Sequence, residues 1–210
     1  MARTTPTIFN ISLARFPMPA KLLFTAVLLT LGTGYIFAIG NIALKVGFAP
    51  DEVATKYYGN EASRQAIEDI EAGDATGEAG VEEGEEFSFD DLDDQEGMSD
   101  EPIVPIPTFE TLVAEGHFHL FGYTSIFFLC GLVLLFAELP AMLKNVLIVA
   151  PFAASVLDTW SILLTRFVGP GFAWMLIISG MVMSLSFLLV FVIGIYQLWF
   201  LKNHEEPVTQ

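Results

Sequence analysis

The chain has 210 residues, of which 53% are apolar, and it carries nine Lys and Arg against 25 Asp and Glu. A composition this apolar, with so few basic residues, excludes an ordinary soluble domain and favours a membrane protein. The formal net charge of −16 is concentrated in residues 51–101, which hold 19 of the 25 acidic residues and two basic ones. Nucleic acids and anionic lipid surfaces both require clustered Lys or Arg, so neither is expected as a partner of the soluble part.

Four apolar stretches are long enough to cross a hydrocarbon core of about 30 Å, which takes about 20 helical residues. They predict an all-α fold, a bundle of four transmembrane helices with spans at residues 22–44, 118–137, 146–164 and 172–201. The first span is interpreted as an uncleaved anchor, because no good cleavage site follows it. The helix that contains the second span is expected to run over residues 108–137, with Thr108 as its N-cap.

Residues 45–107 connect the first and second spans and form a long acidic loop. Within this loop, residues 51–71 have the spacing of a short helix. Residues 72–100 are mostly Gly, Glu and Asp with almost nothing to bury, so we expect them to be disordered. The simplest interpretation of this segment is a solvated spacer, and the alternative is a docking segment for a partner.

Basic residues near the helix ends set the expected orientation, because cytoplasmic loops are enriched in Lys and Arg. The residues on which this expectation depends are Arg3, Arg15, Lys21, Lys144 and Lys202. The N-terminal segment 1–21 and the tail 202–210 are therefore expected to be cytoplasmic, with the acidic loop on the other side. The expected location is a bacterial inner membrane, crossed several times.

The densest group of ionisable side chains opens the second helix. Glu115, His119 and Tyr123 are four residues apart and share one face, whereas His117 points about 160° away from His119. The two histidines therefore cannot bind one metal ion on a continuous helix. Each is a separate candidate ligand for haem iron or another metal, and Glu115 is expected to accept a hydrogen bond from His119.

Asp158 lies inside the third span and Arg166 ends it. Because the second helix begins on the side of the membrane where the third ends, Asp158 and Arg166 are expected at the depth of the two histidines. Ionisable groups in a bilayer are costly unless they are paired or face a cavity. The expected cofactor-binding pocket comprises His117, His119, Glu115, Tyr123, Asp158 and Arg166, with Tyr35, Asn41 and Trp174 at the same level as candidate walls.

Five short segments carry a resemblance to a known family: residues 57–61 (YYGNE), 116–121 (GHFHLF), 157–158 (LD), 164–168 (LTRFV) and 172–174 (FAW). The chain resembles an uncharacterised family of small four-helix bacterial inner-membrane proteins, with a His-Phe-His motif opening the second transmembrane helix. Some proteins of this kind lie beside respiratory or multihaem electron-transfer components, so the resemblance favours a redox role by analogy. The acidic segment after Ala72 departs from the family pattern.

Two hypotheses about function remain open at this point. In the first, the protein is a cofactor-binding accessory subunit linked to respiratory electron transfer, in which His119 or His117 binds haem b or a quinone. Asp158 would then accept a proton, and Arg166 would pair with a propionate or a headgroup. In the second, the protein is a non-catalytic scaffold or accessory subunit whose acidic loop recruits a partner, such as a cytochrome, on the outer face.

Other classes of function are less well supported by the sequence. No CxxCH motif is present, which excludes covalent c-type haem attachment, and no hydrolase motif is present, so we do not expect an enzyme. A transporter or proton channel is disfavoured because the charged residues cluster at one depth. Gly180 and Ser184 form a small-residue pair in the fourth span, which predicts close helix packing within the bundle or in a homo-oligomer.

Overall fold

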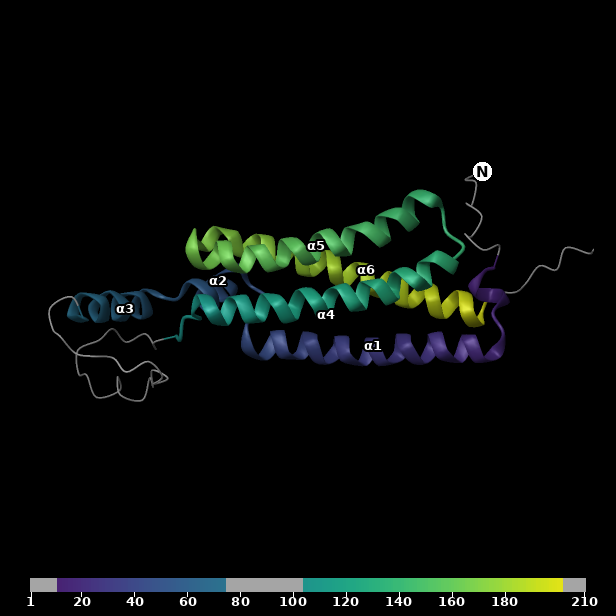
Figure 1. The fold of residues 1–210 in the computed structure, drawn as a ribbon, viewed down its shortest axis with the longest axis horizontal. Helices are drawn as coiled ribbons and strands as arrows, with labels where there is room; N and C mark the ends of the chain where they lie inside the picture. Colours follow the sequence, from purple (N-terminus) through teal and green to yellow (C-terminus); the bar gives the residue numbers. More distant parts are fainter. Residues whose placement is uncertain (1–10, 75–103, 202–210) are drawn as a thin grey trace, which may run out of the picture.

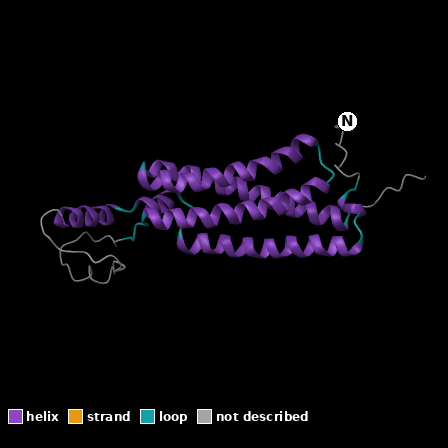
Figure 2. Cartoon of the chain, viewed as in Figure 1, coloured by secondary structure: helices purple, strands orange, loops and turns teal. Residues whose placement is uncertain are grey.

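The computed structural model describes residues 11–74 and 104–201. Most of the segment expected to be disordered, residues 72–100, therefore lies outside the described residues, as do residues 1–10 of the N-terminal segment and the tail 202–210. No strand occurs in the two described ranges, which are almost entirely helical (Figure 2). The predicted all-α fold is confirmed.

Four long helices run side by side, and two shorter helices lie at one end of the bundle (Figure 1). The long helices are α1 (Met18–Lys45), α4 (Phe109–Phe136), α5 (Ala141–Phe167) and α6 (Ala173–Trp199). The shorter elements are α2 (Pro50–Tyr58), α3 (Glu61–Asp74) and the single 3-10 turns η1 (Leu13–Arg15) and η3 (Pro170–Phe172). Each long helix is long and apolar enough to cross a membrane, as predicted.

The two ends of the bundle differ in what covers them. The name "α2 end" is used for the end of the bundle where α1 and α5 both end, because α2 packs there against α5, α6 and η3. We call the opposite end, where α1 begins and α6 finishes, the terminal end. The helix α3 extends beyond the α2 end, away from the four long helices (Figure 1).

Local sequence explains where several helices begin and end. Thr108 is the N-cap of α4, as expected, and its side chain accepts a hydrogen bond from the Thr111 backbone N–H at 3.2 Å. The residues expected to form one short helix after α1 form two instead, because Gly59 has φ of +88° and ends α2. Asn60 directly precedes α3, and its side-chain oxygen accepts a hydrogen bond from the Ser63 backbone N–H at 3.0 Å.

The chain reverses between α4 and α5 next to a hydrogen-bonded glutamine. Gln197 of α6 is 6% exposed, and its amide forms two hydrogen bonds with the backbone of Glu138. The Glu138 N–H donates to the glutamine oxygen at 2.7 Å, and the glutamine nitrogen donates to the Glu138 carbonyl at 3.0 Å. Both backbone groups would otherwise have no hydrogen-bond partner close to hydrocarbon. Gln197 therefore supplies the hydrogen bonds that the backbone needs just after α4.

Packing is closest among α4, α5 and α6, whereas α1 lies at the edge of the bundle and is attached mainly to α6. Leu28 is the one buried residue of α1. Its side chain fits over Gly194 of α6, where an added Cβ would lie 2.9 Å from Leu28 Cδ1 and 3.1 Å from Val133 Cγ1. The absent side chain of Gly194 therefore allows α1, α4 and α6 to meet at one point.

We predict that Gly194→Val destabilises the protein by about 1–3 kcal/mol, because a larger side chain overpacks the contact between Leu28 and Val133. The measurement is reversible unfolding in detergent micelles. Gly34→Val on α1 is the matched control, since an added Cβ at Gly34 meets nothing within 4 Å. Equal losses of stability in the two variants would contradict this account of the packing.

Candidate functional site

A buried carboxylate lies between α5 and α6 near the α2 end. Asp158 is 5% exposed, and its Oδ1 lies 2.9 Å from the hydroxyl of Ser179, which is also buried. The same hydroxyl lies 2.8 Å from the Leu176 carbonyl, so its single proton can be donated to only one of the two oxygens at a time. Ser179 therefore connects α6 to α5, its most closely packed neighbour, through Asp158.

His119 and Tyr123, two members of the predicted stripe on α4, lie near this carboxylate. The rings of His119 and Tyr123 lie 5.6 Å apart, centroid to centroid, with an interplanar angle of 41°. Tyr123 and His119 both lie close enough to Asp158 to interact electrostatically with its carboxylate. Gly116, one position from Glu115, brings α4 close to α5, since an added Cβ there would lie 3.0 Å from Thr159 Cγ2. The shared face of α4 thus places His119 and Tyr123 beside Asp158, and Glu115 near Tyr57.

His119 carries the most unusual atom of the cluster. Its Nδ1 is buried and has no hydrogen-bond partner among the residues that the structure describes. The hydrogen bond expected from His119 to Glu115 is therefore not made by this nitrogen. A buried nitrogen left unpaired costs about 1–3 kcal/mol, so a proton donor or acceptor from outside the described chain would stabilise this arrangement.

His117 lies on the other side of α4, as its spacing predicts. The side chain is exposed on the outside of the bundle, where its ring is 4.7 Å from the ring of Phe121 and 5.7 Å from that of Phe118. The two histidines do not converge. No group of three or more His, Cys, Asp or Glu side chains in residues 11–74 and 104–201 is placed to hold a metal ion.

Arg166 is engaged at the end of α5 rather than with Asp158. Its Nε donates to the Pro107 carbonyl at 3.3 Å, and its guanidinium lies 5.4 Å from the centre of the Phe167 ring. Arg166 therefore attaches the segment before α4 to the end of α5.

Two of the three candidate wall residues lie away from the cluster, whereas Tyr35 lies within electrostatic interaction distance of Tyr123. Asn41 is exposed, and so is Trp174 at 58%. Tyr35 of α1 stacks on Phe187 of α6, with 4.7 Å between ring centroids, and donates a hydrogen bond to Ser184. One member of the predicted small-residue pair, Ser184, is thus in contact with α1.

Tyr57 is the member of the cluster that sequence reasoning missed. It is 4% exposed on α2, within a second apolar core that also contains Val53, Leu112, Ile162 and Ala173. Burial raises the pKa of the Tyr57 phenol, and the nearby charges of Glu115 and Asp158 raise it further. The spacing of Val53 and Tyr57, four residues apart after Pro50, was the available signal for a helix with one buried face.

The helix α2 thus closes the α2 end over the polar cluster. Its apolar face packs on α5 and α6. Tyr57 thereby adds a hydroxyl group to the cluster from the α2 end. Burial of Tyr57 and Asp158 lowers the dielectric constant around these two side chains and strengthens their electrostatic interactions. The arrangement combines a histidine nitrogen, two phenols and a carboxylate, which can hold or transfer a proton.

These features define a multi-pass helical membrane protein with a polar cluster enclosed at one end of the bundle. Residues 47–205 match the Aq_1264_TM family, described as a transmembrane helical domain, and the chain belongs to this family. The matched range begins after α1 and contains every residue of the cluster. No curated protein and no solved structure matches the chain.

We predict a favourable coupling between Asp158 and Ser179 of about 0.6 kcal/mol, with about 1.7 kcal/mol as its upper range, as is found for hydrogen bonds between transmembrane helices. A double-mutant cycle of Asp158→Ala and Ser179→Ala, followed by reversible unfolding in micelles, measures this quantity. Additive losses of stability would contradict a direct bond between α5 and α6.

We also predict that stability falls at alkaline pH because of Tyr57. Its folded-state pKa is raised, so its contribution to stability is fully present below the unfolded pKa of about 10 and is lost as the pH rises above that value. Tyr57→Phe should make the decline between about pH 9 and about pH 11 shallower in thermal unfolding. Tyr58→Phe is the control for removing a phenol from the same helix, and identical profiles for Tyr57→Phe and the wild type would refute the prediction.

Proposed function

We propose that the cluster of Tyr57, His119, Tyr123 and Asp158 binds the head group of a membrane quinone. In this proposal the protein is an accessory subunit linked to respiratory electron transfer in a bacterial inner membrane, with both termini in the cytoplasm. The observation that carries the proposal is the buried Nδ1 of His119, which has no partner in the described residues. The resemblance to proteins found beside respiratory components supports the same class of function by analogy.

The chemistry of the cluster suits a small ring with polar atoms on opposite edges. A quinone has two opposed oxygens that accept hydrogen bonds, and the corresponding quinol donates them. Nδ1 of His119 can donate or accept according to its tautomer, and the Tyr57 hydroxyl lies in the electrostatic environment of Glu115 and Asp158. The aromatic rings of Tyr57 and Tyr123 provide flat apolar surfaces beside these polar atoms.

A haem b group fits the described residues less well than a quinone does. Haem iron is held by axial ligands, and the two histidines of α4 lie on different sides of the helix. Of the two histidines in the part of the chain that the structure describes, only His119 would be available as a ligand inside the bundle. We therefore place haem b second among the candidate cofactors.

The residues of the chain would have separate tasks in this site. A bound quinone would supply two-electron, two-proton redox chemistry. His119 would orient the head group, and Asp158, held by its hydrogen bond to Ser179, would accept or hold a proton. Glu115, which is partly exposed, lies between the cluster and the surface and would exchange that proton with water.

A scaffold function without a cofactor is the second candidate, and one observation favours it. Asp158 and Arg166 both have partners that tie segments together, Ser179 and the Pro107 carbonyl respectively. In addition, α3 carries the exposed acidic residues Glu61, Glu68 and Asp69 on a helix that extends beyond the bundle (Figure 1). On this hypothesis the acidic segment recruits a partner, and the polar side chains only hold the helices together.

The test is the extraction of bound lipids from the protein purified in mild detergent, with an absorption spectrum before and after dithionite. We expect quinone in the wild type and in His117→Ala, and at least about a tenfold loss in His119→Ala, which corresponds to about 1.4 kcal/mol of binding free energy. His117→Ala is the matched control because His117 faces away from the cluster.

Two other outcomes would replace the proposal. A Soret band that disappears in His119→Ala would make haem b the cofactor. A colourless, quinone-free protein that co-purifies with a partner through residues of the acidic loop would support the scaffold function.

A further inference from the structure

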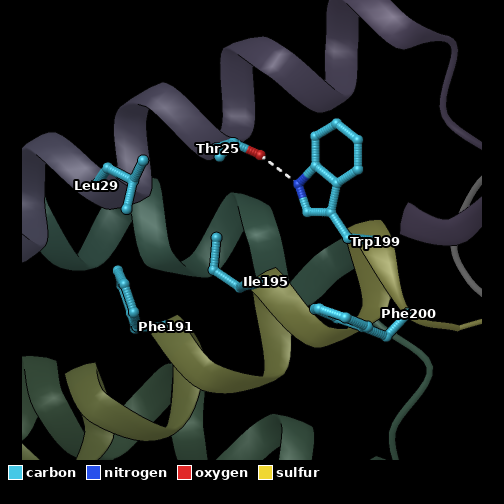
Figure 3. Close-up of a pocket in the computed structure, with 6 residues that line it drawn as sticks. All are labelled: Thr25, Leu29, Phe191, Ile195, Trp199 and Phe200. Atoms are coloured by element: carbon cyan, nitrogen blue, oxygen red, sulfur yellow. Dashed lines mark hydrogen bonds between the residues drawn. The ribbon is translucent and has the colours of Figure 1, made fainter.

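A groove of about 690 Å³ lies between α1 and α6 at the terminal end, far along the bundle from the cluster around Asp158. It is lined by Thr25, Leu29, Phe191, Ile195, Trp199 and Phe200, and Figure 3 shows these side chains around an open space. Its size is typical of a small-molecule site, for which about 300–1,000 Å³ is usual.

The walls of this groove suit a hydrocarbon ligand. Leu29, Phe191 and Ile195 present only carbon atoms, and the two polar side-chain groups among the six lining residues bond to each other. The indole N–H of Trp199 donates to the Thr25 hydroxyl oxygen at 2.9 Å (Figure 3). A polar ligand would find few partners here, whereas an apolar chain loses nothing by entering.

The depth of the groove matches one leaflet of a bilayer. Thr25 and Leu29 lie about 10 and about 16 Å from the start of α1, and Phe191 lies about 12 Å from the end of α6, at about 1.5 Å per residue. Half of a hydrocarbon core is about 15 Å thick. Trp199 ends α6, where tryptophan is favoured at the membrane interface. The groove therefore extends from the interface toward the bilayer centre.

Positive charge lies at the interfacial end of this groove. Lys21 is one helical turn before Thr25 on the same face of α1. Arg15 ends η1, which packs against α6 at the same end of the bundle. These cations lie where the phosphate of a lipid would be if its acyl chain occupied the groove, and they favour an anionic headgroup.

The attachment of α1 leaves room for such a lipid. Leu28 is the one residue of α1 that is buried, and α1 precedes residues 47–205, the range that matches the transmembrane helical domain family. We propose that the groove binds one acyl chain of an anionic phospholipid, with the phosphate beside Lys21, and that this lipid fastens α1 to α6. The proposal is independent of the quinone site.

Native mass spectrometry of the purified protein tests the proposal, followed by titration of the delipidated protein with phosphatidylglycerol or phosphatidylcholine. We expect one retained phospholipid per chain and tighter binding of phosphatidylglycerol. Leu29→Trp fills the groove and should reduce retention at least fivefold. Leu23→Trp, on another exposed face of α1, should leave retention unchanged. Lys21→Gln should remove the preference for the anionic lipid, whereas Lys45→Gln at the other end of α1 should keep it.

Several outcomes would overturn the inference. They are the absence of a retained lipid, equal effects of Leu29→Trp and Leu23→Trp, and a preference for the anionic lipid that survives Lys21→Gln. A wild-type dimer that Leu29→Trp dissociates would assign the groove to a second copy of the chain instead. Circular dichroism confirms that each variant is folded, and Leu29→Phe provides a smaller filling substitution if the tryptophan variant is not.

Discussion

The arrangement at the α2 end depends on one constraint, which is the cost of burying a carboxylate between transmembrane helices. Asp158 is nearly inaccessible, and in hydrocarbon its oxygens must be hydrogen-bonded within the protein. Ser179 of α6 provides a hydrogen-bond partner, and Tyr123 of α4 lies within electrostatic interaction distance. Asp158 therefore connects α5 directly to α6, and the absent side chain of Gly116 allows α4 to approach α5 beside it.

The cover over this carboxylate comes from outside the four spans. The helix α2 belongs to the connection between α1 and α4, yet Val53 and Tyr57 are as buried as residues of the bundle core. Their apolar contacts with Ile162 and Ala173 bury Tyr57, and Asp158 is buried as well, so these two members of the cluster lie in a low-dielectric environment. A connection that looks like a solvated spacer by charge thus supplies part of the candidate site.

The sequence predicted those features that depend on local pattern. The length and apolar content of the four spans were sufficient to predict them as transmembrane helices, and the residue type of Thr108 was sufficient to predict it as an N-cap. The rotation of about 100° per residue placed His117 and His119 on different sides of α4. Each of these inferences uses residues that are near one another in the chain.

Other residues expected to line the pocket were chosen by their depth in the membrane alone. The direction in which each side chain points around its helix axis was not taken into account. Arg166 is eight residues after Asp158, which turns it about 80° around α5, and it bonds to Pro107 instead of joining the cluster. Asn41 and Trp174 are at a suitable level but lie on exposed faces. The position of Tyr57 depends on how α2 folds back onto α5 and α6, and no pattern within the loop determines that packing.

The most direct test of the central claim, that the cluster is a ligand site, is an experimental structure of the protein in lipid nanodiscs with native lipids retained. We predict density that does not belong to the chain within about 3.2 Å of Nδ1 of His119, in contact with Tyr57 or Tyr123. Nδ1 bonded directly to Glu115, with protein side chains filling the space between α2 and α4, would contradict the claim.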